Sequence, residues 1–355
     1  MSFRGARGLV VASFNPACDT LLTMVALRVE DVEVYPLVTG RAYDGEVGER
    51  RGALKKGNKF ESWLYANGAR LLATVVAVEF GLRADNMQVE DLRKVRARRR
   101  QTLQEARLAR TREILQRLAN NLPVPDLLIQ PAFAVSIAPG EYRVVYPDYA
   151  VLSRWEQMYV VGEIKAFITR DNKAPALSLK RTRRQAAVEV IALREEAARF
   201  GLEGRVDDRA ACVFGTVKGL NPSAVYQERL DAEVSEVRTA LRRLERTSAL
   251  GLGTSQSVEE LFQNLVGTRA FNFEEQCFSI CALHTVCRAR IASQPTVLGD
   301  EAADALGAEV DLPRLAELIR GATPLTPAES SFVSVVSDLI GLLGYGPETW
   351  AERVA

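Results

Sequence analysis

Two carboxylates and a lysine near the middle of the chain have the types and spacing to bind a divalent cation. Glu163 and Lys165 lie in a run rich in valine and tyrosine, residues 158–167, and Asp148 ends an earlier run of the same kind. Two such runs around a polar break predict a β-hairpin. Side chains alternate along a strand, so Glu163 and Lys165 share one face and Ile164 points away. Carboxylate oxygens suit Mg²⁺ or Mn²⁺, and a nearby lysine can orient water or stabilise phosphate charge.

The same residues have a simpler interpretation. A Glu-x-Lys triplet is common and is usually a solvated pair of charges, and a second Pro-Asp dipeptide, Pro125-Asp126, shows that this half of the pattern also occurs elsewhere in the chain. Charged residues are nevertheless depleted in apolar strands. Their presence in this hairpin therefore favours a functional role.

Five cysteines add a second possible site. An odd number, with no secretory signal at the first residue, predicts reduced thiols and a cytosolic protein. Cys277 and Cys281 share a helix face at i, i+4, and Cys287 follows closely. The only histidine, His284, lies among them, so Cys277, Cys281, His284 and Cys287 could form a zinc site. The simplest alternative is three buried cysteines without a metal. Cys212, in an apolar run, is expected in the core.

The hairpin resembles the PD-(D/E)XK nuclease superfamily. The matching residues are Pro147 and Asp148, followed after a gap by Glu163 and Lys165. The resemblance implies an α/β fold with a restriction-endonuclease-like core, in which helices flank a small mixed β-sheet, and we expect a helical C-terminal region after it. It also implies that Asp148, Glu163 and the carbonyl of Ile164 bind Mg²⁺ or Mn²⁺.

Two further positions resemble the RecB-like branch of this superfamily. Glu61 takes the place of the His or Glu that reaches the metal from an early helix, although a first-turn glutamate is also favoured by the helix dipole alone. Gln185 matches a glutamine on the helix after the Glu-x-Lys strand and completes the implied catalytic set, but the residue four positions later is Glu189 instead of tyrosine. The basic run 180–184 is either a solvated helix start or a phosphate contact.

The cysteines extend the resemblance to the iron–sulfur members of the RecB-like branch, such as the AddB nuclease domain and the CRISPR-adaptation exonucleases. In these proteins one N-terminal and three C-terminal thiolates hold a [4Fe–4S] cluster, which here implies Cys18, Cys277, Cys281 and Cys287 as ligands. The family spacing is C-x2-C-x5-C, whereas this chain has C-x3-C-x5-C. We rank the iron–sulfur cluster first, zinc second and no metal third.

Composition is compatible with a folded protein that binds DNA. Of 355 residues 47% are hydrophobic, enough for a sizeable core. The net charge of +1 gives no indication of nucleic-acid binding by itself, but basic residues cluster at 96–100 and 180–184. The longest apolar stretch, residues 71–78, is too short to span a bilayer, so we expect no membrane partner.

The apolar spacing predicts the elements around the site. We expect a strand at 32–37, a helical region at 57–81 and one long charged helix at 89–120. After the hairpin we expect a helix at 177–200, a strand at 209–215 and a break at 219–222. The remainder is predicted to be mostly helical, with loops at 251–254 and 293–300. We place a nuclease domain at 1–292 and a helical extension at 293–355.

The resemblance implies a metal-dependent deoxyribonuclease, and we favour an exonuclease over an endonuclease. Its partners would be single-stranded DNA or duplex ends, together with a helicase or other proteins of DNA repair, recombination, CRISPR adaptation or anti-phage defence. Two alternatives remain open. One is a non-catalytic DNA-binding or scaffold subunit of a nuclease–helicase complex. The other is an interaction protein stapled by a metal, with no role in nucleic-acid chemistry.

Overall fold

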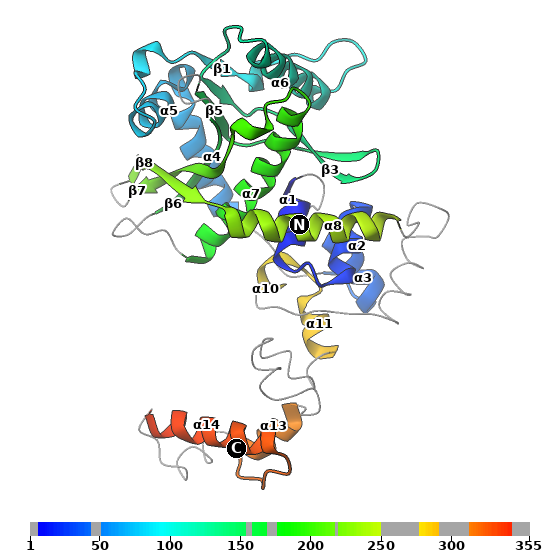
Figure 1. Cartoon of the computed structure of the whole chain (residues 1–355). Coiled ribbons are helices and arrows are strands. Elements are labelled where there is room, and N and C mark those ends of the chain that lie inside the picture. Colours follow the sequence, from blue (N-terminus) through cyan, green and yellow to red (C-terminus); the bar gives the residue numbers. More distant parts are fainter. Residues whose placement is uncertain are drawn as a thin grey trace. The chain divides into compact units, whose positions relative to one another are not determined.

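The computed structural model describes residues 6–43, 51–153, 158–168, 176–216, 219–249, 277–290 and 312–342. The chain divides into two compact units (Figure 1). The first comprises residues 1–16, 21–30 and 48–261, and the second comprises residues 17–20, 31–47 and 262–355. None of the helices in the described segments is both long and apolar enough to cross a membrane.

A mixed β-sheet forms the centre of the first unit. Its six strands have the order β1-β2-β5-β6-β7-β8, and β1/β2 and β6/β7 are parallel while the other neighbours are antiparallel. The strands are β1 (Val89–Asp91), β2 (Leu127–Ile129), β5 (Tyr149–Ser153), β6 (Met158–Ile168), β7 (Val206–Thr216) and β8 (Gly219–Arg229). A separate two-stranded sheet pairs β3 (Phe133–Ala138) with β4 (Glu141–Val145).

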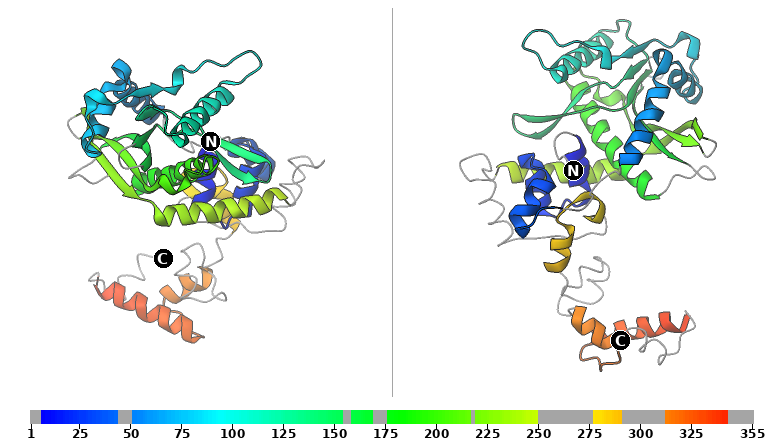
Figure 2. Two further views of the ribbon diagram at one scale, coloured as in Figure 1. Left: turned by 45° about the horizontal axis from the view of Figure 1, so that its top comes forward. Right: turned by 180° about the vertical axis from the view of Figure 1, so that it is seen from behind.

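Helices pack on both faces of the six-stranded sheet (Figure 2). On one face, α4 (Arg51–Leu64) and α5 (Ala66–Glu79) bury Phe60, Leu64 and Leu72 against strand residues that include Ile164. The opposite face of β6 and β7 is covered by α7 (Ala176–Ala198), on which α1 (Ala6–Phe14) and α8 (Asp231–Ala249) pack. The prediction of a mixed α/β fold, with a small sheet flanked by helices, is therefore confirmed.

The register of the β5–β6 hairpin places Asp148 beside Glu163. Tyr149 pairs with Gly162, so the residue before β5 lies next to the residue after Gly162. The ring of Tyr149 packs against Gly162, where a Cβ atom would lie 2.1 Å from ring carbons, and its hydroxyl donates to the carbonyl of Ala211 at 2.7 Å. Only glycine fits at position 162, and the tyrosine connects β5, β6 and β7.

Two elements predicted in the first half of the chain differ from the structure. Residues 32–37 form helix α3 (Asp31–Thr39), not a strand, although Pro36 lies inside it. The long helix predicted at 89–120 is strand β1 followed later by α6 (Leu103–Ala119). The capping box of Thr102 and Glu105 begins α6 because each side chain bonds the other residue's backbone N–H.

The helical region predicted at 57–81 is interrupted. Asn67, Gly68 and Ala69 have positive φ angles and separate α4 from the regular part of α5. Glycine tolerates this conformation without strain, which makes Gly68 a natural point for the change of direction.

The hairpin and its surroundings also differ from the prediction. The valine- and tyrosine-rich run before Asp148 is split, because β4 pairs with β3 and only β5 pairs with β6. The break predicted at 219–222 is instead the start of β8, an edge strand whose pairing with β7 is irregular near Pro222. An edge strand tolerates proline because one side of its backbone needs no partner. The predictions of a helix at 177–200 and a strand at 209–215 are confirmed by α7 and β7.

The second unit is helical where it is described after residue 276. Its helices are α10 (Cys277–Ile280), α11 (His284–Arg290), α13 (Leu312–Ile319) and α14 (Pro327–Leu342). Leu315 and Leu318 of α13 pack with Phe332 and Val333 of α14. The loops predicted at 251–254 and 293–300, and the domain boundary after residue 292, lie outside the described residues.

Candidate active site and cysteine cluster

Asp148, Glu163 and Lys165 lie together at one end of the β5–β6 hairpin. The ammonium of Lys165 forms an ion pair with Glu163 and lies 3.9 Å from Asp148 Oδ2. The backbone N–H of Ile164 donates to the same Asp148 oxygen at 2.7 Å, while the Ile164 side chain points into the core on the other face. Glu163 is fully buried, and the side chains of Asp148 and Lys165 are 13% and 25% exposed. The group is therefore largely buried, with partial exposure at Asp148 and Lys165.

The charges of this group shift each other's pKa. Burial and the neighbouring Glu163 raise the pKa of Asp148 well above its usual value, although Lys165 opposes the shift. Burial by itself would lower the pKa of Lys165, but the carboxylates of Glu163 and Asp148 outweigh it and the net pKa is raised. Lys165 is therefore a permanent cation at neutral pH, suited to stabilising negative charge and unsuited to accepting a proton.

Helix α7 adds two residues to the same site. Gln185 donates from Nε2 to Glu163 at 2.9 Å and to Glu189 at 3.2 Å. Glu189 is only 1% exposed, and burial together with the charge of Glu163 raises its pKa well above the usual value. The resemblance does not predict Glu189 as a residue of the site. The available signal was its spacing of one helical turn from Gln185 and its place as a carboxylate in an otherwise apolar stretch of the helix.

The C-terminal end of α4 reaches the site from its other side. Tyr65 donates its hydroxyl to the backbone carbonyl of Asp148 at 2.9 Å, and the guanidinium of Arg93 lies 4.1 Å from the centre of the Tyr65 ring. Glu61, one turn earlier, is close enough for its charge to contribute to the raised pKa of Asp148. The interpretation of Glu61 as a first-turn residue is wrong, because α4 begins at Arg51 and the glutamate lies in its last turn. A carboxylate there is disfavoured by the helix dipole.

The side chains of Asp148, Glu163 and Glu189 offer carboxylate oxygens, the ligands that Mg²⁺ and Mn²⁺ prefer. Glu189 Oε2 is buried and has no hydrogen-bond donor among the described residues, so the site contains an acceptor that a cation would satisfy. Within the described segments no three His, Cys, Asp or Glu side chains are already close enough together to hold a metal ion. The residue types thus fit a divalent cation, while the side chains would need to converge further around it.

Four of the five cysteines gather in the second unit. Cys18, Cys277, Cys281 and Cys287 are each at most 7% exposed. Burial is the main cause of the raised pKa of Cys281, and the other three thiols all contribute to it, which places them around Cys281. The structure thus brings Cys18 close to the three C-terminal cysteines, although Cys18 and Cys277 are 259 residues apart in the sequence.

Short helical segments position the trio. The N–H of Cys281 donates to the carbonyl of Cys277 at 3.1 Å, and Nδ1 of His284 lies 2.8 Å from the carbonyl of Cys281. The sequence predicts that Cys277 and Cys281 lie on one face of a helix. The helix that joins them is only one turn long, because α10 ends at Ile280. Cys212 is separate from this group: it lies fully buried on β7, paired in register with Glu163, as expected of a core residue.

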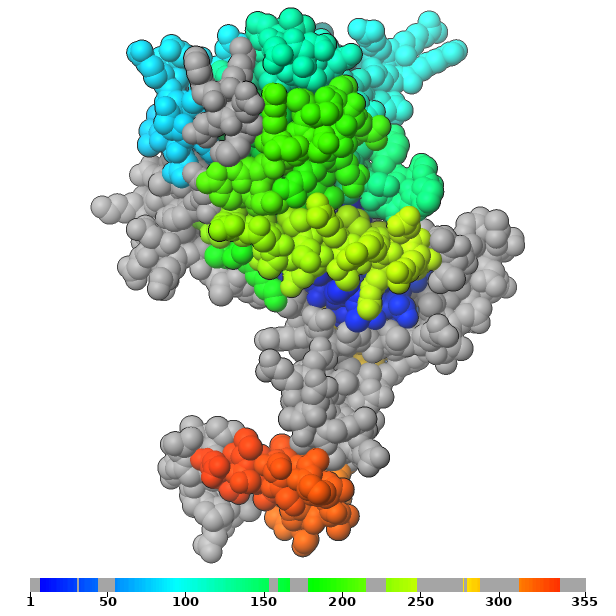
Figure 3. All heavy atoms as spheres, in the orientation of Figure 1, coloured from blue at the N-terminus to red at the C-terminus, as the bar shows by residue number. Residues whose placement is uncertain are grey.

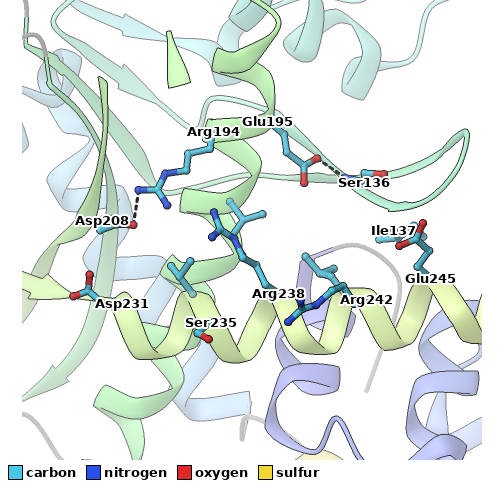
Figure 4. A pocket seen from close by; sticks show the side chains of 13 residues that line it. Ser136, Ile137, Arg194, Glu195, Asp208, Asp231, Ser235, Arg238, Arg242 and Glu245 are labelled. Atoms are coloured by element: carbon cyan, nitrogen blue, oxygen red, sulfur yellow. Dashed lines mark hydrogen bonds and ion pairs between the residues drawn. The ribbon is translucent and has the colours of Figure 1, made fainter. Parts of the chain in front are cut away.

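A cavity of about 700 Å³ lies elsewhere in the first unit, between α7, α8 and β3 (Figure 4). Arg194 of α7 forms an ion pair with Asp208, and Glu195 accepts from the backbone N–H of Ser136 at 2.7 Å. In the space-filling view α8 covers part of the green segment that contains α7 (Figure 3). Because this cavity contains none of the residues around Glu163, we identify the candidate site by its convergent charged groups and not by cavity size.

Comparisons with known proteins do not identify a family for this chain: no protein-family model matches it, and no curated protein and no solved structure is significantly similar to it.

Proposed function

We propose that this protein is a metal-dependent deoxyribonuclease that hydrolyses phosphodiester bonds by the chemistry of the PD-(D/E)XK superfamily. The observation that carries the proposal is the convergence of Asp148, Glu163 and Lys165 at the β5–β6 hairpin, with Gln185 hydrogen-bonded to Glu163. These residues come from three elements and are brought together in a largely buried group. Such a costly arrangement of charges is a frequent feature of active sites.

The topology around the hairpin supports a restriction-endonuclease-like core. An antiparallel hairpin carries both acidic positions, and β6 then connects through α7 to the parallel strand β7. The helix of this crossover returns across the sheet and presents Gln185 to Glu163. The order of acid, Glu-x-Lys strand and glutamine-bearing helix is the one that the resemblance implies.

Each residue has a role that follows from its contacts. Asp148, Glu163 and the carbonyl of Ile164 would hold Mg²⁺ or Mn²⁺, with Glu61 as a further ligand from α4. When bound, the cation supplies a water of lowered pKa and neutralises phosphate charge. Lys165, permanently charged between two carboxylates, stabilises the negative charge that develops on the phosphate. Gln185 fixes the orientation of Glu163 through its hydrogen bond.

For the cysteines we propose a structural [4Fe–4S] cluster held by Cys18, Cys277, Cys281 and Cys287. The support is that all four thiols contribute to one local environment around Cys281. A zinc site built from Cys277, Cys281, His284 and Cys287 is the alternative. Cys18 is not a ligand in this zinc site. The burial of Cys18 close to the other three cysteines therefore favours the iron–sulfur cluster.

One observation favours a second function, that of a non-catalytic DNA-binding or scaffold subunit. Lys165 already neutralises Glu163 through a direct ion pair, so this carboxylate is stabilised without a metal. In that case the fold would be retained for binding and no bond would be cut.

The two functions are separated by incubating purified protein with linear duplex and single-stranded DNA. Nuclease function predicts cleavage that requires Mg²⁺ or Mn²⁺ and stops with EDTA. Binding of either DNA without cleavage, across a range of both cations, would support the scaffold instead. Failure to bind or cut DNA would leave only the metal-stapled interaction protein.

A further inference from the structure

The α7 side of the candidate site contains a carboxylate that the catalytic roles above do not use. Glu189 is 1% exposed, and one of its oxygens accepts a hydrogen bond from Gln185 at 3.2 Å. Its other oxygen, Oε2, is buried and has no donor among the described residues. The Gln185 amide thus donates to Glu163 and Glu189 together and holds two buried carboxylates on either side of one NH₂ group.

Three acidic side chains meet one ammonium at this site. Asp148, Glu163 and Glu189 are three carboxylates, and the only ammonium in direct contact with them among the described residues is that of Lys165. The unsatisfied oxygen of Glu189 carries the cost of a missing hydrogen bond, and burial beside Glu163 favours the protonated form of this carboxyl when no metal is bound. A divalent cation between Glu163 and Glu189 would coordinate this oxygen and supply the positive charge that two ionised carboxylates need.

The position of Glu189 relative to Glu163 gives such a cation a defined place. Lys165 and Asp148 contact Glu163 at the hairpin, whereas Gln185 and Glu189 approach it from α7. A carboxylate has two oxygens and can bridge two cations, as in sites where a pair of metals about 3.5–4 Å apart stabilises the attacking and leaving oxygens. Glu163 lies between the two groups and is the residue able to bridge.

We propose that Glu189 is a ligand for a second divalent cation, Mg²⁺ or Mn²⁺, which it holds together with Glu163 on the α7 side of the site. This inference rests on the proposed function for the first cation, bound at Asp148 and Glu163. It assigns a chemical role to the residue that replaces the tyrosine expected from the resemblance.

The test counts Mn²⁺ bound to the metal-free protein in the absence of DNA, by titration calorimetry and by electron paramagnetic resonance. We expect about two ions per chain for the wild type and about one for Glu189→Gln. Glutamine keeps the size of the side chain, and its amide can donate to Glu163, so the variant should fold without metal. Glu195→Gln is the matched control, because Glu195 lies on the same helix but accepts from Ser136. It should bind two ions.

A thermal measurement gives a second readout. We expect the melting temperature of metal-free Glu189→Gln to equal or exceed that of the wild type, because the unsatisfied acceptor is gone, and the rise produced by Mn²⁺ to be smaller. If Glu189→Gln does not fold, Glu189→Ala, which is smaller, is measured in its place.

A wild-type count of one ion, or an unchanged count and Mn²⁺-induced melting shift in Glu189→Gln, would overturn the inference. Glu189 would then only share a proton with Glu163. DNA cleavage by the wild type, measured in parallel, separates the two proposals. Two bound ions without cleavage would leave the second cation site standing and remove the nuclease function, whereas cleavage with one bound ion would do the opposite.

Discussion

The ammonium of Lys165 lies between two carboxylates that keep it charged. Lys165→Ala should therefore reduce metal-dependent cleavage by roughly 10²–10⁴-fold, the loss typical of removing one electrostatic stabiliser or acid–base group. Glu163→Gln should have an effect of the same order by removing a cation ligand. Lys94→Ala is the matched control, since Lys94 is 77% exposed and pairs only with Asp91 in the described contacts. Initial rates on linear DNA measure the effect, and undiminished cleavage by both site variants would refute the assignment.

Glu61 differs from an ordinary helix residue because it lies in the last turn of α4. If it served only the helix, Glu61→Gln would leave activity unchanged and gain about 0.3–1 kcal/mol, because a carboxylate is disfavoured at a helix C-terminus. As a cation ligand, Glu61→Gln should raise the Mn²⁺ concentration needed for half-maximal cleavage. A Mn²⁺ titration of the cleavage rate, with a urea unfolding curve for the same variant, distinguishes the two. An identical titration would remove Glu61 from the site.

The raised pKa of Glu189 predicts a pH dependence of stability. In the metal-free protein the folded chain holds the proton of this carboxyl more tightly than the unfolded chain does, because burial and Glu163 raise its pKa above the usual 4.5. The folded state thus binds more protons above pH 4.5, and its stability falls as pH rises toward the raised pKa. Glu189→Gln should lose less stability than the wild type between about pH 5 and about pH 8 in EDTA. Parallel curves of melting temperature against pH would contradict this.

At the scale of elements, the contact between Tyr149 and Gly162 holds the hairpin in the register that pairs Asp148 with Glu163. Gly162→Ala should destabilise the protein by about 1–3 kcal/mol, the usual cost of overpacking a core, because the added methyl would overlap the Tyr149 ring. Gly57→Ala is the control: it lies in α4 with open space around it, and alanine there should stabilise by about 0.5–1 kcal/mol. Urea unfolding measures both. Equal stabilities of the two variants would show that the ring can move aside.

At the scale of the whole molecule, substitutions of the cysteines test whether a metal centre holds distant segments of the second unit together. Four-thiolate iron–sulfur ligation predicts a brown protein when purified without oxygen, with broad absorption near ~400 nm. Cys18→Ala should bleach it and lower its melting temperature, because a metal centre that closes so long a loop stabilises the folded chain. His284→Ala should keep the colour, and so should Cys212→Ala, since Cys212 lies on β7 outside the group.

The zinc alternative predicts the reverse result: a colourless protein that contains zinc, is destabilised by His284→Ala and tolerates Cys18→Ala. A colourless, metal-free preparation that remains stable after Cys277→Ala would contradict both metal models. The four cysteines would then be core residues, in keeping with their burial.

The sequence by itself determined the local features that depend on neighbours along the chain. Strand alternation placed Glu163 and Lys165 on one face and Ile164 on the other, and apolar spacing located α7 and β7. It also indicated that Asp148 would meet Glu163, because a hairpin brings nearby segments together. Each of these features depends only on residues that are close to one another in the sequence.

Tertiary structure alone decided the features that depend on distant partners. Residues 32–37 form a helix in which only Val34 is buried, and nothing in their local propensity for strands predicts it. The segment at Pro222 is an edge strand because its pairing with β7 outweighs the local signal for a break. Glu189 entered the site only because α7 packs across β6, and Cys18 joined the trio only because the chain returns to it after more than 250 residues. The pattern of residues within one segment cannot predict these long-range contacts, because they depend on how whole helices and strands pack together.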